Sequence, residues 1–190
     1  MLISKKTPLK NILMLSSNCK NCGNCCKNGQ GFVLNEETKT IAEYLKISEE
    51  ELLKNYLEKT TLFNKEILKT KTKNQKKNNK IPTGPCVFYE EEKGCLIHEV
   101  KPLFCRVVNC KPYSTEIIQW YFLNYVLDKE DPEAIRQWAH FIKYNEPIPG
   151  AKLNELVDEE KLNKIMNFEL LNKTQINIEQ LKELMKSILK

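Results

Sequence analysis

Half of the cysteines in this chain lie within one run of eight residues, Cys19-Lys20-Asn21-Cys22-Gly23-Asn24-Cys25-Cys26. After a long stretch without cysteine, the other four follow as a second group: Cys86, Cys95, Cys105 and Cys110. Thiolate sulfur is a soft ligand that suits zinc and iron–sulfur clusters. Two groups of clustered thiols therefore predict a fold that is organised around bound metal.

Disulfide bonds are the alternative use of these cysteines, and the sequence favours metal over them. The apolar run at residues 12–15 is too short for a membrane span or for the core of a signal peptide. We therefore expect a cytoplasmic protein without a membrane partner, in a compartment that keeps thiols reduced. The neighbours Cys25 and Cys26 are also poorly placed to pair, because a disulfide requires a particular separation and dihedral angle.

The formal net charge of +5 raises the question of nucleic-acid binding. Counting eight thiolates and two divalent metals lowers this charge to about +1, so nucleic acid is not expected as a partner. Basic residues interleaved with the cysteines would compensate an anionic metal centre, although each one singly is equally well explained as a solvated surface residue. Residues 70–80 carry five lysines and no apolar residue, which predicts a solvated loop or hairpin tip.

Helix signals dominate the rest of the chain. Asn35 precedes two glutamates, Ser48-Glu49-Glu50-Glu51 forms a capping box, and Asp131-Pro132 combines a cap with proline at the first helical position. Pro102 is expected to open a short helix that carries Cys105, and residues 115–127 form an aromatic-rich helix. The helix that begins after Ser48 is expected to bury its leucines, Leu52, Leu53 and Leu57.

Short strands are expected at residues 32–34, 86–89 and 95–98, the last two joined as a hairpin by a turn around Gly94. The predicted fold class is mainly α with a few short β-strands, a small α+β fold. We assign residues 1–150 to a cysteine-cluster metal-binding domain and residues 151–190 to a helical C-terminal extension with an amphipathic stripe.

The spacing within the first cysteine run is typical of metal turns. A Cys-x-x-Cys pair places two sulfurs on one tight turn, for which Gly23 permits a positive φ. Cys25 extends the pair to the triplet spacing of bacterial ferredoxin motifs, which suits one face of an iron–sulfur cube. Cys26 is expected to serve another metal or to bridge. In the second group, Cys86 and Cys95 are expected at the two ends of the hairpin, near enough to share a site.

A buried apolar thiol is the alternative for each downstream cysteine singly. Four stretches nevertheless agree with one family pattern: Cys19-x-x-Cys22-Gly23-x-Cys25-Cys26, Gly84-Pro85-Cys86-Val87-Phe88-Tyr89, Gly94-Cys95-Leu96-Ile97-His98, and Lys101-Pro102-Leu103-Phe104-Cys105-Arg106 to Cys110. In these stretches the chain resembles the CxxCxxCC family of YkgJ-like cysteine-cluster proteins, described as zinc or iron chelators. The resemblance covers residues 15–125. It implies a common metal-ligand role for all eight cysteines: Cys19, Cys22, Cys25, Cys26, Cys86, Cys95, Cys105 and Cys110.

Three positions depart from this family pattern. His98 stands where the family usually has tyrosine, Lys101 where it has arginine, and Asn109 where it has proline. Lysine at 101 removes a bidentate donor. His98 is either an extra metal ligand or, as we favour, a partly exposed strand histidine. His140, on a predicted helix, is interpreted as an ordinary core or surface histidine.

These observations favour a metal-binding protein whose eight cysteines hold a [4Fe-4S] cluster, zinc or both, in one or two centres with a structural or redox role. An iron–sulfur-dependent, methylase-like protein-modifying enzyme is the alternative, because a flagellin lysine methylase carries a related cysteine pattern. Such an enzyme implies a protein substrate or partner. A metallochaperone or a zinc-type nucleic-acid binder ranks third. The sequence carries no recognisable cofactor fingerprint, since Gly29-x-Gly31 lacks the required strand and helix context.

Overall fold

A computed structural model describes residues 2–16, 19, 21–76, 84–108 and 113–171, and confirms a small α+β fold made mainly of helices. The N-terminal half contains α1 (Leu9–Ser16), α2 (Asn24–Asn28), β1 (Phe32–Val33), the 3-10 turn η1 (Asn35–Glu37), α3 (Thr38–Leu45), α4 (Glu49–Asn55), β2 (Leu57–Leu62), β3 (Lys65–Thr70) and α5 (Lys73–Lys76). The C-terminal half contains β4 (Tyr89–Glu90), β5 (Gly94–Cys95), the 3-10 turn η2 (His98–Val100), α6 (Leu103–Val107), α7 (Ser114–Tyr121), the π-helical turn η3 (Phe122–Val126), α8 (Pro132–Tyr144), α9 (Leu153–Leu156) and α10 (Glu159–Met166).

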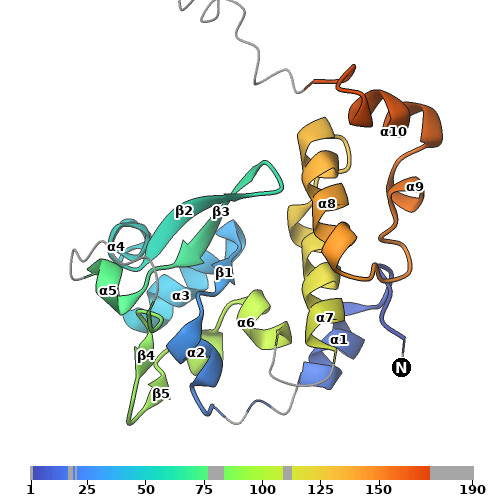
Figure 1. Ribbon diagram of the computed structural model, residues 1–190. Coiled ribbons are helices and arrows are strands. Elements are labelled where there is room, and N and C mark those ends of the chain that lie inside the picture. Colours follow the sequence, from blue (N-terminus) through green and yellow to red (C-terminus); the bar gives the residue numbers. More distant parts are fainter. Residues whose placement is uncertain (1, 17–18, 20, 77–83, 109–112, 172–190) are drawn as a thin grey trace, which may run out of the picture.

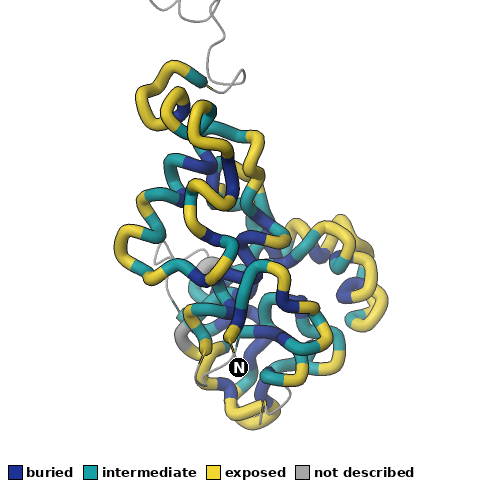
Figure 2. Tube along the Cα trace, turned by 90° about the vertical axis from the view of Figure 1, so that its right-hand side faces the viewer, coloured by how far each residue is buried: buried dark blue, intermediate teal, exposed yellow. Residues whose placement is uncertain are grey.

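These elements form two lobes (Figure 1). The cysteine lobe contains the two small sheets with α2 to α5, and the helical lobe contains α1 and α7 to α10. Buried residues run through the interior of both lobes, while exposed residues line the outer turns (Figure 2). Among the described residues, no helix combines the length and apolar character that a membrane crossing requires.

The β2–β3 hairpin connects the two lobes. Its strands pair antiparallel from Leu57↔Thr70 to Leu62↔Lys65, and β1 adds to the free edge of β3. The turn consists of Phe63 and Asn64, both with positive φ, as in a two-residue type I′ turn. The hairpin tip points toward the helical lobe (Figure 1), where Phe63 is buried against α8 and η3. The sequence did not predict this hairpin.

The helical lobe has a continuous apolar core around Tyr121 and Trp138, both fully buried. The Asp131 side chain caps α8 by accepting hydrogen bonds from the N–H groups of Glu133 and Ala134, as predicted. Residues from the predicted extension pack in the same core, namely Ala151, Leu156, Val157 and Ile165. The assignment of a boundary at residue 150 stays a prediction, and the predicted stripe at 178–188 lies outside the described residues.

The cysteine lobe has a separate, smaller core. Its fully buried members include Ile41, Leu52 and Leu57, and the rings of Tyr56 and Phe88 stack with centroids 5.3 Å apart. Cys86 belongs to this core, while Cys26 and Cys95 pack against its edge. The thiols therefore form part of the apolar packing of this lobe as well as its candidate metal site.

Several local predictions were only partly right. Ser48 caps α4 as expected, accepting a hydrogen bond from the Glu51 N–H, but Leu53 faces solvent because α4 buries only its Leu52 face. Leu57 is buried in a strand rather than in the helix. The predicted Lys-rich loop was wrong over residues 70–76, the part of it that the structure describes. Thr70 closes β3, and residues 73–76 form α5, because the chain pairs with Cys86 at Thr72 before turning.

The predicted cysteine hairpin is present but shorter than expected. β4 and β5 pair only at Tyr89↔Cys95 and Glu90↔Gly94. Cys86 lies in an isolated bridge with Thr72, outside the hairpin. His98 lies in the 3-10 turn η2 rather than in a strand, because pairing ends at Cys95.

Candidate metal centre

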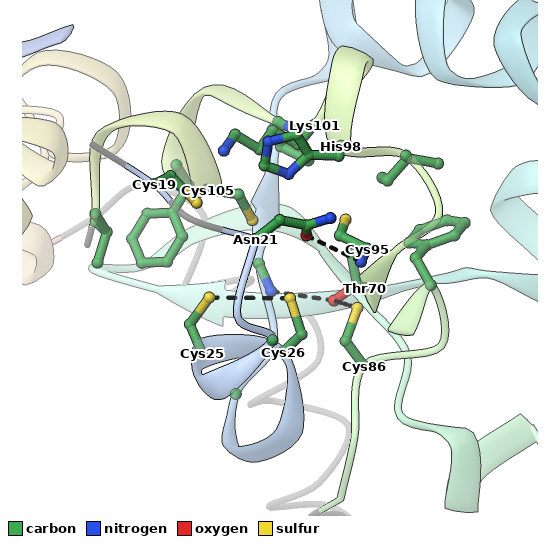
Figure 3. Close-up of a pocket in the computed structure, with 18 of the residues that line it drawn as sticks. Cys19, Asn21, Cys25, Cys26, Thr70, Cys86, Cys95, His98, Lys101 and Cys105 are labelled. Atoms are coloured by element: carbon green, nitrogen blue, oxygen red, sulfur yellow. Dashed lines mark hydrogen bonds between the residues drawn. The ribbon is translucent and has the colours of Figure 1, made fainter. Parts of the chain in front are cut away.

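Seven cysteines line one cavity of about 550 Å³ in the cysteine lobe. They are Cys19, Cys22, Cys25, Cys26, Cys86, Cys95 and Cys105. The eighth predicted ligand, Cys110, lies outside the described residues. Figure 3 shows sulfurs from the first cysteine run, the β4–β5 hairpin and α6 facing a common space. Residues more than 80 positions apart in the sequence thus meet at one site, although their role as ligands stays a prediction.

The first cysteine run turns tightly so that its sulfurs face the cavity. Asn21 and Gly23 both adopt positive φ, and α2 begins directly after them. Gly23 is also required for space, because a β-carbon there would overlap the Tyr89 ring. On α2, the Cys25 and Cys26 sulfurs lie 3.9 Å apart. The predicted role of Gly23 in the turn is confirmed, with the close approach of Tyr89 as a second reason for glycine.

Two hydrogen bonds fasten the first cysteine run to the second group. The Cys86 N–H donates to the Cys26 carbonyl at 2.7 Å, and the Cys95 N–H donates to the Asn21 side-chain oxygen at 3.2 Å. Cys86, Cys26 and Cys95 are themselves predicted ligands, and Asn21 is the sequence neighbour of another, Cys22. The relative position of the two cysteine groups is therefore set by the protein backbone as well as by any metal.

Thr70 and Glu37 position the remaining thiols. The Thr70 hydroxyl accepts from the Cys86 thiol at 3.4 Å and from the Gly31 N–H at 3.0 Å. Glu37 accepts from the Leu103 N–H at 2.6 Å, at the first residue of the helix that carries Cys105. Burial raises the pKa of the Glu37 carboxyl, partly offset by the two N–H groups that it accepts from. Neither residue stood out in the sequence, because each is remote along the chain from the cysteine it serves.

The thiols differ in exposure and acidity. Cys19, Cys22 and Cys25 are exposed, whereas Cys86 is buried. The Cys26 thiol hydrogen-bonds with the sulfurs of Cys25 and Cys95, which lowers the pKa of Cys25 to about 6 and that of Cys95 to about 7. The same two bonds raise the pKa of Cys26, and burial raises the pKa values of Cys86 and Cys105. Cys25 is thus mainly a thiolate near neutral pH and Cys95 is partly ionised, so both are able to accept a cation.

The donor set fits a thiophilic metal. Thiolates are the preferred ligands of zinc and of iron–sulfur clusters, and here seven cysteine sulfurs surround one space. Across the described ranges, however, no three Cys, His, Asp or Glu side chains converge closely enough to hold a single ion as they stand. The sulfurs are distributed around the wall of a cavity rather than gathered about a point.

A basic pair lies on the opposite side of this cavity. His98 and Lys101 both line it, across from the sulfurs of Cys25, Cys26 and Cys86 in Figure 3. Burial, followed by the charge of Lys101, lowers the pKa of His98. The sequence marked both positions as departures from the family pattern without indicating that they share the cavity. His140 stays outside the site, exposed on α8 beside the ring of Tyr144.

Gly31 packs tightly against a cysteine sulfur of the site. We predict that a larger side chain at this position weakens metal binding. A β-carbon at Gly31 would overlap the Cys105 sulfur. Gly31→Ala should therefore displace this thiol and weaken metal binding by about 10–100-fold, the usual effect of disturbing a ligand's immediate support. Competition with a chromophoric chelator measures the affinity. Gly29→Ala is the matched control, because among the described residues its added carbon would meet a backbone carbonyl, that of Cys25 at 3.1 Å, and no sulfur. Equal affinity in both variants would contradict the placement of Cys105 as a ligand.

Turns and short elements that bring clustered thiols to one cavity are typical of cysteine-ligand metal proteins. The family model CxxCxxCC, described as "Putative zinc- or iron-chelating domain", matches residues 18–123. The chain belongs to this family, and the resemblance drawn from its sequence motifs is confirmed. No curated protein and no solved structure matched the chain.

Proposed function

We propose that this chain is a cytoplasmic metal-binding protein whose cysteines hold an iron–sulfur cluster in the thiol-lined cavity. The observation that carries the proposal is the gathering of seven thiols, from segments on both sides of the β2–β3 hairpin, around one cavity. Such a centre would supply either one-electron redox chemistry or a cross-link between the two cysteine groups.

The distribution of the sulfurs supports a cluster over a single zinc ion. In a tetrahedral zinc site with Zn–S bonds near 2.3 Å, every pair of sulfurs lies about 3.8 Å apart. The Cys25–Cys26 pair meets this distance at 3.9 Å, yet no third described ligand completes a common site. A polynuclear core spreads its ligands farther apart than one ion does, in keeping with a cavity of about 550 Å³. The Cys19-x-x-Cys22-x-x-Cys25 spacing points the same way.

Metal and sulfide analysis of anaerobically purified protein tests this proposal. We expect a brown protein with about four iron atoms and four acid-labile sulfides per chain, the composition of a [4Fe-4S] cluster. Cys22→Ser and Cys105→Ser should each lose most of the iron, because they remove ligands from different segments. His140→Ala, outside the cavity, is the control and should keep its iron content. A colourless protein with stoichiometric zinc would contradict the cluster and leave a structural zinc protein.

A further inference from the structure

One side of the cavity is built differently from the rest. Across from Cys25, Cys26 and Cys86 the wall carries His98 and Lys101 (Figure 3). Apolar residues also line the cavity, among them Pro102, Phe104 and Val108, together with polar side chains such as Asn21 and Thr70. A wall of apolar surface with a few polar groups is typical of small-molecule pockets, whose volumes run from about 300 to 1,000 Å³. The cavity, at about 550 Å³, lies within this range, but the metal centre takes part of it, so a ligand on this side has only the remaining space.

Lys101 brings a positive charge to this wall, and no carboxylate of the described residues forms an ion pair with it. In the described part of the chain, the ion pairs involve seven other lysine or arginine side chains, and none involves Lys101. Lys93, on the neighbouring β4–β5 turn, is by contrast paired with Glu90 at 3.1 Å. A half-buried ammonium that faces a cavity and lacks a carboxylate is available to an anion from outside.

Compensation of thiolate charge is the simpler role for Lys101, since its field also stabilises the Cys25 and Cys95 thiolates. That role needs only a charge near the sulfurs. It does not account for an imidazole beside the ammonium, or for an apolar wall that continues past both. A bound ligand accounts for the ammonium, the imidazole and the apolar wall together. Its charged end would meet the basic pair, and its body would cover the apolar wall.

We propose that the His98–Lys101 side of the cavity binds a small carboxylate with an apolar body, next to the metal centre. This inference rests on the proposed function, since the metal defines the opposite wall. A single ammonium matches the single charge of a carboxylate, whereas a phosphate dianion calls for an arginine fork or several N–H donors. The imidazole of His98 donates a second hydrogen bond to the carboxylate, and Phe104 and Val108 contact the apolar body.

The test uses full-length protein whose metal content has been measured first. The probe is 3-phenylpropionate, with 3-phenylpropan-1-ol as its neutral counterpart, and binding is followed by calorimetry. We expect saturable binding of the carboxylate with a Kd below about 1 mM, and binding of the alcohol at least about tenfold weaker. Lys101→Met, compared with the unaltered protein at equal metal content, should weaken carboxylate binding by at least about tenfold. Lys93→Met is the matched control and should bind as the unaltered protein does.

The possible results distinguish failure of the proposed metal centre from failure of the proposed ligand site. Protein without metal would refute the proposed function before any ligand is added. Metal-replete protein that shows no saturable binding at about 10 mM probe would overturn the ligand site. So would equal binding of the alcohol and the carboxylate. Loss of metal from Lys101→Met, with binding of the probe unaffected once metal is restored, would assign this lysine to charge compensation alone.

Discussion

Removing the metal from the loaded protein should unfold the cysteine lobe and leave the helical lobe folded. The two lobes have separate apolar cores, and among the described residues the cysteines that belong to a core lie in that of the cysteine lobe, while Cys105 lies on α6, whose Leu103 and Val107 pack in the helical core. Cys86 is 8% exposed within the core of the cysteine lobe, and Cys26 and Cys95 pack at its edge. Without a metal, the Cys25 and Cys95 thiolates repel each other at the edge of this small core.

The expected effect is large because metal binding of this kind is also folding free energy. A structural zinc contributes about 10–16 kcal/mol in small domains, so its loss exceeds what the core of the cysteine lobe can replace. The hydrogen bonds from Cys86 to Cys26 and from Cys95 to Asn21 should open, because they lie next to the ligands. The helical lobe is expected to persist around Trp138 and Tyr121, because the described members of their core include no cysteine.

Hydrogen exchange measured by mass spectrometry separates the two lobes. After chelation, amide protection in residues 21–28 and 84–100 should fall by at least about a thousandfold. Protection in residues 114–144 should change little, and tryptophan fluorescence should stay native, since both tryptophans lie in the helical lobe. Reloading the metal under reducing conditions is the control and should restore protection. Simultaneous loss of protection in both lobes would show that the metal stabilises the whole chain as one cooperative unit.

Local chemistry explains which elements the sequence predicts well. Asp131 and Ser48 cap helices through their own side chains, so the signal and its effect lie within three residues. The meeting of the cysteines at one cavity followed from their chemistry and family pattern. The residues that position them did not, because Glu37 reaches Leu103 across 66 positions. Such a contact exists only once the fold has formed.

In the β2–β3 hairpin, by contrast, the local sequence does not indicate the turn that forms. A type I′ turn normally carries Asn-Gly, and here the first turn position is Phe63. A bulky residue with positive φ is strained in isolation. Its burial at 4% exposure among aromatic rings of the helical lobe compensates for this strain. Tertiary packing therefore decides this turn, against the preference of the local sequence.

Phe63→Ala should strongly destabilise the fold away from the metal site. The Phe63 ring makes edge-to-face contacts with Phe122 at 5.3 Å, Trp138 at 5.4 Å and Phe141 at 5.9 Å, measured between ring centroids. Truncation leaves a cavity between the hairpin and α8 while the positive φ of the turn persists. We expect the free energy of unfolding to fall by about 3–5 kcal/mol, measured by urea denaturation with tryptophan fluorescence.

Tyr144→Ala provides the matched control for this aromatic truncation, because Tyr144 is 71% exposed near the end of α8. Its effect should stay within about 0.5 kcal/mol. The metal content of Phe63→Ala should remain that of the unaltered protein, since Phe63 is not among the residues that line the thiol cavity. A loss below about 1 kcal/mol would mean that the hairpin tip is not anchored in the helical core. Loss of metal from Phe63→Ala would instead mean that the hairpin transmits strain from its tip to Thr70, at its other end, and from there to Cys86.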